Sequence, residues 1–242
     1  MSDSVFHFKQ FTIHQDRSAM KVGTDAVLLG SWVSPPATGR FLDIGTGCGI
    51  LALMLAQRSK ASIDAIDIDE GSCSQARDNV VASPWPEQIH IFHESLQNYV
   101  NAPHEKYDLI VSNPPYFVDA PKPSEEARST ARHTDHTLSF EELANALPLL
   151  LKPDGAFYVI LPYKEGNDFR EIATEKGLHC LEVLKVRTVS GKQVKRLMMR
   201  FSLSEGPFNE GELSIQLANG KYTQQYKELT KDYYLSLKEY RN

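Results

Sequence analysis

Residues 40–49 read RFLDIGTGCG, an apolar run that passes into three alternating glycines. The run at 40–44 predicts a buried strand, and the residues at 50–58 predict the helix that follows it. Glycines 45, 47 and 49 allow the tight turn by which a strand feeds directly into a helix. We therefore expect this segment to be the first strand–turn–helix unit of an α/β fold.

Strands and helices continue to alternate along the chain. Strands are predicted at 63–68, 89–92, 107–111 and 156–161, and helices at 71–82, 139–151 and 169–176. The helix at 139–151 has one apolar face and a capping box formed by Ser139 and Glu142. This spacing predicts βαβ units, with a mainly parallel sheet and helices on both of its faces. Two longer stretches, 179–189 and 194–203, predict a closing antiparallel hairpin.

We expect the chain to form one domain over residues 1–242. Within it, residues 1–22 are predicted to be an N-terminal extension that carries three phenylalanines, and residues 23–242 to be the core. The last 20 residues, rich in tyrosine and lysine, predict a capping helix at the C-terminal end of this core.

Composition narrows the class of protein. A mean hydropathy of −0.35 and 24% charged residues are ordinary for a soluble protein. The longest apolar run is far too short to span a membrane, and the first residues lack the layout of a secretory signal. Three cysteines without CxxC spacing favour reduced thiols in the cytoplasm over disulfides or a zinc site.

Charge is distributed unevenly along the chain. The formal net charge is −5, which by itself argues against nucleic acid as a partner. Between Val183 and Ser204, however, there is no acidic residue. This segment carries six cations: Lys185, Arg187, Lys192, Lys195, Arg196 and Arg200. The segment predicts either contacts to phosphate groups or a solvated basic hairpin.

The glycine turn does not fit a dinucleotide site. The dinucleotide motif G-x-G-x-x-G has its third glycine where this chain has Ile50. Asp43 precedes the turn, where it would repel a pyrophosphate seated at the helix N-terminus. An acidic side chain at this position suits a ligand that carries an ammonium group and no phosphate. S-adenosylmethionine is such a ligand.

Asp67 gives the turn an acidic partner at the end of the second strand. It lies 22 positions after Gly45, close to the offset at which an acidic residue meets a ribose hydroxyl in nucleotide-binding sheets. The alternative is a tight turn beside an exposed strand-end aspartate. At the end of the third strand, Ser95 is expected either beside an adenine ring or as a helix cap.

The stretch VSNPPYFV ends the fourth strand, at the edge where open α/β sheets bind ligands. The Asn113 side-chain oxygen and the Pro114 carbonyl can accept both N–H groups of a planar amine, such as the exocyclic amine of adenine. Pro114 and Pro115 stiffen the turn. Tyr116 can stack on the base, a contact worth about 1–3 kcal/mol, and Phe117 braces Tyr116. The alternative is a proline-terminated strand whose aromatic residues cover the core.

Together, the DIGTGCG turn, Asp67 and NPPYF resemble the Rossmann-like, S-adenosylmethionine-dependent amino methyltransferases. The stretches at 8–33, 128–133 and 222–235 are similar to the bacterial tRNA(Val) adenine-N6 methyltransferase family, which methylates adenine 37 beside the anticodon. The resemblance extends over nearly the whole chain. Many members of the family carry an aspartate near the position of Ser95.

The resemblance implies a fold, a cofactor and a partner. The fold is a Rossmann-like class I methyltransferase, with a seven-stranded, mostly parallel sheet whose last strand is antiparallel. The cofactor is S-adenosyl-L-methionine, released as S-adenosyl-L-homocysteine, and residues 21–25 border its pocket. The partner is tRNA, bound through its anticodon stem-loop. Separately from the resemblance, we expect a cytoplasmic monomer that needs no metal.

The predicted site has three parts. The catalytic residues are Asn113, Pro114, Pro115 and Tyr116. The cofactor-binding residues are Lys21, Gly23, Thr24, Asp43, Gly45, Thr46, Gly47, Asp67, Ile68, Ser95 and Asn113. The substrate-binding residues are Tyr116, Phe117, Arg128, Arg132, Lys195 and Arg196. His133 and His136 have a spacing compatible with a metal, but without further ligands nearby they indicate a surface loop.

Other classes of protein fit less well. A glutamine-N5 protein methyltransferase also uses NPPY, but those enzymes carry a helical N-terminal domain, for which the 39 residues before Arg40 are too few. A DNA adenine methyltransferase needs an added target-recognition region. A nicotinamide oxidoreductase conflicts with Asp43 and Ile50. A non-catalytic RNA-binding module is possible but does not require an intact NPPY clamp.

Overall fold

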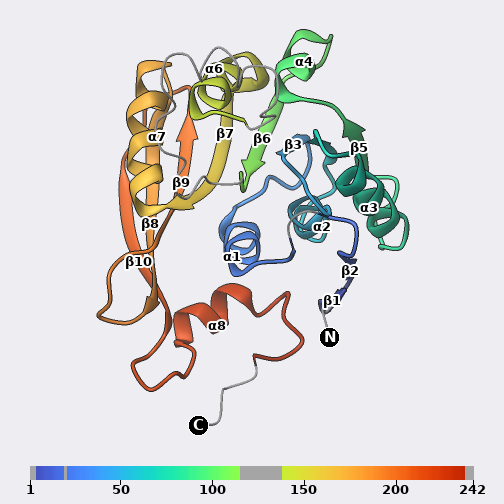
Figure 1. Ribbon diagram of the computed structural model, residues 1–242. Coiled ribbons are helices and arrows are strands. Elements are labelled where there is room, and N and C mark those ends of the chain that lie inside the picture. The colour runs from blue at the N-terminus through green and yellow to red at the C-terminus, as the bar shows by residue number, and fades with distance from the viewer. Residues whose placement is uncertain (1–3, 19–20, 115–137, 238–242) are drawn as a thin grey trace, which may run out of the picture.

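The computed structural model describes residues 4–18, 21–114 and 138–237. Eight strands form one sheet in the order β10-β8-β9-β7-β6-β3-β4-β5, and two short strands, β1 (Val5–His7) and β2 (Thr12–His14), pair with each other. Helices lie on both faces of the large sheet (Figure 1). None of the helices in the described ranges is long and apolar enough to cross a membrane.

The strands of the sheet are β3 (Arg40–Ile44), β4 (Ser62–Asp67), β5 (Ile89–His93), β6 (Tyr107–Ser112), β7 (Leu151–Pro162), β8 (His179–Val189), β9 (Arg196–Ser202) and β10 (Asn209–Gln216). The helices are α1 (Thr24–Trp32), α2 (Ile50–Ala56), α3 (Glu70–Val81), α4 (Leu96–Asn101), α6 (Phe140–Leu150), α7 (Tyr163–Glu175) and α8 (Gln224–Thr230). β9 runs antiparallel to both of its neighbours, β7 and β8, and the other neighbouring strands pair in parallel. The predicted α/β fold and antiparallel hairpin are confirmed.

Successive residues of the central strands point to opposite faces of the sheet and build two cores. Phe41 of β3 packs with residues of α1, α2 and the N-terminal segment. The next residue, Leu42, packs with residues of α4, α6 and α7. Both side chains are completely buried. The sheet therefore separates two apolar layers, and its strand ends remain at the edges where polar residues can gather.

The sheet has one strand more than the seven that the resemblance implies. The eighth strand, β10, pairs in parallel with β8 at one edge of the sheet. Its sequence, NEGELSIQ, contains no continuous apolar run, and only Leu213 within it is buried. It pairs with the backbone of β8 from Asn209 to Gln216, and two ion pairs also join the strands: Lys185 to Glu210 at 2.6 Å and Arg187 to Glu212 at 3.0 Å. Pairs of this kind cannot be seen along the chain.

Two helix predictions are wrong in extent. α7 begins at Tyr163, six residues before the predicted start. The prediction began too late because Gly166 lies in the first turns of the helix. Glycine disfavours helix by about 1 kcal/mol, but a Cβ atom there would lie 3.0 Å from Leu197 Cδ1, so glycine lets α7 approach β9 closely. The predicted C-terminal capping helix is only the seven residues of α8, which ends at Thr230.

We expect Gly155→Ala to destabilise the fold. A Cβ atom at Gly155 would lie 2.8 Å from the Tyr107 carbonyl oxygen, so the backbones of β6 and β7 would have to separate. Overpacking of this kind costs about 1–3 kcal/mol in the free energy of unfolding. Denaturant titration of both proteins measures it. Gly206→Ala is the matched control, because its Cβ would meet only Leu181 methyl groups at 3.5 Å. Equal stability of the two variants would contradict the expectation.

Candidate functional site

The turn between β3 and α2 has a left-handed backbone at each of its three glycines. The φ angles are 72° at Gly45, 56° at Gly47 and 86° at Gly49. No atom lies within 4 Å of a Cβ built at Gly45, so the need for glycine there comes from the backbone angle and not from crowding. The turn consequently presents bare backbone to the space above it.

The end of β4 holds this turn in place. The N–H groups of Gly45 and Thr46 both donate to the Ile66 carbonyl, at 2.9 and 3.0 Å. The Gly47 N–H donates to Asp67 Oδ2 at 2.8 Å, and the other oxygen of Asp67 accepts from the Asp69 N–H at 2.9 Å. Asp67 is therefore fixed by two backbone donors while it remains partly exposed.

Asp43 supports the turn from below. Its side chain is completely buried, and its Oδ2 accepts from the Thr46 hydroxyl at 2.7 Å and from the Ala52 N–H at 3.2 Å. Its Oδ1 has no hydrogen-bond partner within the described part of the chain. Burial raises the pKa of the Asp43 carboxyl from 3.8 to about 7.

A cavity of about 270 Å³ opens above the glycine turn. Of the predicted site residues, eight line it: Lys21, Gly45, Thr46, Gly47, Asp67, Ile68, Asn113 and Pro114. The ends of three neighbouring strands, β3, β4 and β6, thus meet in one space, as the motif order predicts. Thirteen further residues line it, among them Ser18, Glu94, Leu96 and Gln97, which were not predicted as ligands. Glu94 follows β5 as Asp67 ends β4, and this repeated acidic position was the available signal.

Four of the residues predicted to bind the cofactor are not among the residues that line the cavity: Gly23, Thr24, Asp43 and Ser95. Gly23 and Thr24 are the N-cap and first residue of α1. Ser95 is the N-cap of α4, and its hydroxyl oxygen accepts from the Asn98 N–H at 3.2 Å, which matches the alternative that the sequence left open. Asp43 lies beneath the turn, so it positions the turn and does not face the cavity.

Asn113 has an unusual environment. It follows β6, lines the cavity, and its side-chain oxygen is buried without a hydrogen-bond partner among the described residues. A buried acceptor left unpaired costs about 1–3 kcal/mol, so it needs a physical explanation, and among the residues that line the cavity Asn113 has such an atom. The remaining residues of the clamp, Pro115, Tyr116 and Phe117, lie outside the described residues.

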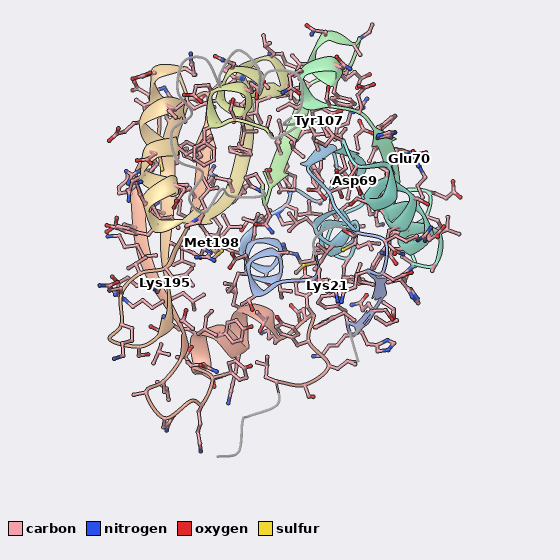
Figure 2. All side chains as sticks on the ribbon, in the orientation of Figure 1. Lys21, Asp69, Glu70, Tyr107, Lys195 and Met198 are labelled. Atoms are coloured by element: carbon pink, nitrogen blue, oxygen red, sulfur yellow. The ribbon has the colours of Figure 1, made fainter. Side chains whose placement is uncertain are left out.

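The basic segment is largely neutralised in the fold. In addition to the two pairs with β10, Arg196 Nε donates to Asp25 Oδ2 of α1 at 2.7 Å. Lys195 is exposed, and it lies on the far side of α1 from Lys21 and Asp69 in the view of Figure 2. Acidic residues of other elements therefore pair with three of the six cations of this segment. Arg128 and Arg132 lie outside the described residues.

Fold and site together define the class of the protein. A glycine turn after β3, an acidic residue at the end of β4 and Asn-Pro after β6, in a sheet of this strand order, are the features of a Rossmann-like methyltransferase. A family model described as the methyltransferase small domain matches residues 17–161. No cluster of three or more potential metal ligands occurs among the residues that the structure describes.

Curated relatives identify the family. The tRNA1(Val) (adenine(37)-N6)-methyltransferase of Bacteroides fragilis (strain YCH46) is 43% identical over 238 residues, which cover 98% of this chain and 100% of the relative. The protein of the same name from Trichodesmium erythraeum (strain IMS101) is 45% identical over 238 residues, covering 97% and 99%. This chain belongs to the tRNA1(Val) (adenine(37)-N6)-methyltransferase family.

Solved structures show the same fold at lower identity. A protein described as a predicted O-methyltransferase from Agrobacterium tumefaciens superposes with a TM-score of 0.67 at 18% identity, over 86% of this chain and 96% of that one. The 16S rRNA N2 G1207 methyltransferase of T. Thermophilus, solved with AdoMet and guanosine, gives a TM-score of 0.58 at 19% identity, over 82% and 50%.

We expect Asp43→Asn to change how stability depends on pH. The raised pKa means that the folded state binds the Asp43 proton more tightly than the unfolded state does. That stabilisation is complete below about pH 4 and is lost as the pH rises towards about 7, by at most about 1.4 kcal/mol per pH unit. Asparagine cannot titrate, so the variant should lack this loss. Denaturant titrations of both proteins between pH 4.5 and 7.5 measure the difference, and parallel curves would show the expectation to be wrong.

Proposed function

We propose that this protein transfers a methyl group from S-adenosyl-L-methionine to N6 of adenine 37 in the anticodon loop of a valine tRNA. The observation that carries the proposal is the buried, unpaired Asn113 oxygen, which lines the same cavity as the glycine turn. The names of the full-length relatives support the choice of substrate.

The residues that line the cavity fit such a cofactor. Asp67 and Glu94 offer carboxylate oxygens for hydroxyl and amino groups, and Lys21 brings positive charge for a carboxylate. Ile68 and Leu96 provide apolar surface for a flat ring. When bound, S-adenosylmethionine supplies a methyl group that is activated by the neighbouring sulfonium. The backbone of the glycine turn, together with the other lining residues, would hold and orient the cofactor.

Asn113 and Pro114 act on the acceptor amine. The lone pair of an exocyclic adenine nitrogen is delocalised into the ring, so the neutral amine is a poor nucleophile. Two acceptors aimed at its N–H groups, the Asn113 side-chain oxygen and the Pro114 carbonyl, draw density onto the nitrogen and hold it in position. Such preorganised acceptors act without the cost of reorganising water. The N–C bond forms as the S–C bond breaks, S-adenosylhomocysteine leaves as a neutral thioether, and the methylated amine releases one proton to water, so no covalent enzyme intermediate is required.

The remaining parts of the proposal concern the partner. Tyr116 and Phe117 stack on and brace the target base, and Arg128, Arg132 and Lys195 contact phosphates. A base in a loop is unstacked more easily than one in a duplex, which suits a site with one rigid clamp. We further propose that the chain acts as one domain over residues 1–242, as a cytoplasmic monomer without a metal.

Asn113→Ala should lower methyl transfer to tRNA by at least about a hundredfold, because it removes an acceptor that acts on the reacting amine. Binding of S-adenosylhomocysteine should change much less, since the turn and Asp67 stay intact. A labelled-methyl assay measures the first effect, and isothermal titration calorimetry measures the second.

The matched control for this experiment is Asn219→Ala, an exposed amide in the turn before α8 that accepts from the Lys221 N–H at 3.1 Å. It should retain normal turnover.

Offering tRNA, duplex DNA and release-factor protein in parallel tests the substrate class. Near-normal turnover by Asn113→Ala would contradict the proposed mechanism. Labelling of release factor instead of tRNA would contradict the proposed substrate.

Lys195→Ala should weaken tRNA binding and reduce its salt dependence. Each phosphate contact that is lost lowers the log–log salt slope by about 0.7 for a single-stranded region. Lys185→Ala is the matched control, because Lys185 is already paired with Glu210 at 2.6 Å. Filter-binding measurements at several salt concentrations report both effects. The same salt slope for Lys195→Ala and the parent protein would show that Lys195 does not contact a phosphate of the tRNA.

A further inference from the structure

The N-terminal segment after β2 reaches the cofactor cavity, although it precedes the methyltransferase core in sequence. Ser18 and Lys21 line the cavity together with residues of the glycine turn. A Cβ atom at Gly47 would lie 3.8 Å from Ser18 Oγ, so Ser18 faces the turn directly. One wall of the cavity is therefore the N-terminal segment, and the facing wall is the turn.

Asn79 of α3 joins these two walls. Its side chain is completely buried. Its Oδ1 accepts from the His14 N–H at 2.8 Å, and its Nδ2 donates to the His14 carbonyl at 2.8 Å. The second N–H of the same amide donates to the Cys48 carbonyl of the glycine turn at 2.9 Å. A single side chain thus fixes the N-terminal segment and the turn relative to each other.

Neighbouring residues of α3 extend the same contact towards the cavity. Gln75 is 1% exposed, and its Oε1 accepts from the Arg17 N–H at 3.1 Å. The Arg17 side chain forms an ion pair with Asp78. A Cβ atom at Gly71 would lie 3.0 Å from the Arg17 carbonyl oxygen, so the segment lies directly on the first turn of α3. The segment is thus held on α3 at both His14 and Arg17.

Within the N-terminal segment, Gln15 closes the loop that carries the two lining residues. Its side chain is 4% exposed, and its Oε1 accepts from the Val22 N–H at 2.6 Å. Ser18 and Lys21 both lie between Gln15 and Val22 in sequence. Gln15 therefore ties Val22 to the end of β2, and His14 and Arg17 are anchored on α3 by Asn79 and Gln75.

We propose that Asn79 is a positioning residue for cofactor binding, which sets the separation between the N-terminal wall and the glycine turn. This proposal rests on the cofactor assignment made under the proposed function. A ligand that contacts both walls needs them at a fixed distance, and the amide of Asn79 is the group that bonds to both. Asn79 does not line the cavity, so its effect on binding passes through His14 and Cys48.

The test uses Asn79→Asp in the full chain. Aspartate keeps the acceptor for the His14 N–H but loses both donors, and it places an oxygen against the carbonyls of His14 and Cys48. Affinity for S-adenosylhomocysteine, measured by calorimetry, should fall about tenfold, which corresponds to about 1.4 kcal/mol. KM for the cofactor should rise to a similar extent, while KM for tRNA stays within about twofold because uniform binding of that substrate is untouched.

Tyr107→Phe is the control for general destabilisation. Tyr107 is fully buried, and its hydroxyl bonds to Asp64 at 2.7 Å in a polar cluster that does not line the cofactor cavity; Figure 2 shows it near the start of β6. It should lower the melting temperature without changing cofactor affinity. If both variants lose affinity in proportion to their loss of melting temperature, Asn79 has a structural role only and the proposal is wrong.

A measurement on the parent protein keeps the test valid if Asn79→Asp does not fold. Saturation with S-adenosylhomocysteine should slow hydrogen exchange at the His14 and Arg17 amides, which bond to Asn79 and Gln75. Unchanged exchange at these amides overturns the proposal while leaving the cofactor assignment intact. Failure of the parent protein to bind S-adenosylhomocysteine at all would overturn the cofactor assignment first.

Discussion

The site depends on one turn that two carboxylates hold from different sides. Asp43, within β3, accepts from the Thr46 hydroxyl and from the Ala52 N–H, which is one of the first amides of α2 that no helical carbonyl can satisfy. Asp67, from the neighbouring strand, accepts from the Gly47 N–H. The left-handed backbone of the glycines is thereby fixed to strand and helix alike, and the other residues of the cavity are arranged around it.

The two carboxylates differ because their surroundings differ. Asp43 is sealed from water and has one unpaired oxygen, so burial raises its pKa to about 7 and favours the protonated form. Asp67 is partly exposed at the cavity, with each oxygen bonded to a backbone amide. An acidic residue before a glycine turn suggests a partner for a cationic ligand, but here Asp43 does not line the cavity, whereas the carboxylates of Asp67 and Glu94 do. Asp43 instead makes the turn rigid.

Much of the fold could be predicted because its signals are local. The apolar run of β3 and the Ser139–Glu142 capping box lie within a few residues of each other, and both are present where the sequence places them. β10 could not be predicted, because its partners on β8 stand 25 residues away in sequence and the pairs form only after folding. The start of α7 was predicted wrongly for the same reason. The close packing that Gly166 allows against Leu197 outweighs the poor helix propensity of glycine, and this contact is visible only in the folded protein.

The same limit applies to the site, and it bears on the tRNA binding that we propose. Asn113, Asp67 and the glycine turn were found because strand ends in a parallel sheet meet at one edge. The cations of the segment after Val183 suggested an electrostatic interface, yet Asp25 of α1 and two glutamates of β10 neutralise three of them. Fewer cations release fewer counterions, so phosphate attraction contributes less to affinity. Under the function proposed above, recognition of the tRNA then rests more on the unstacked base and its fit at Asn113.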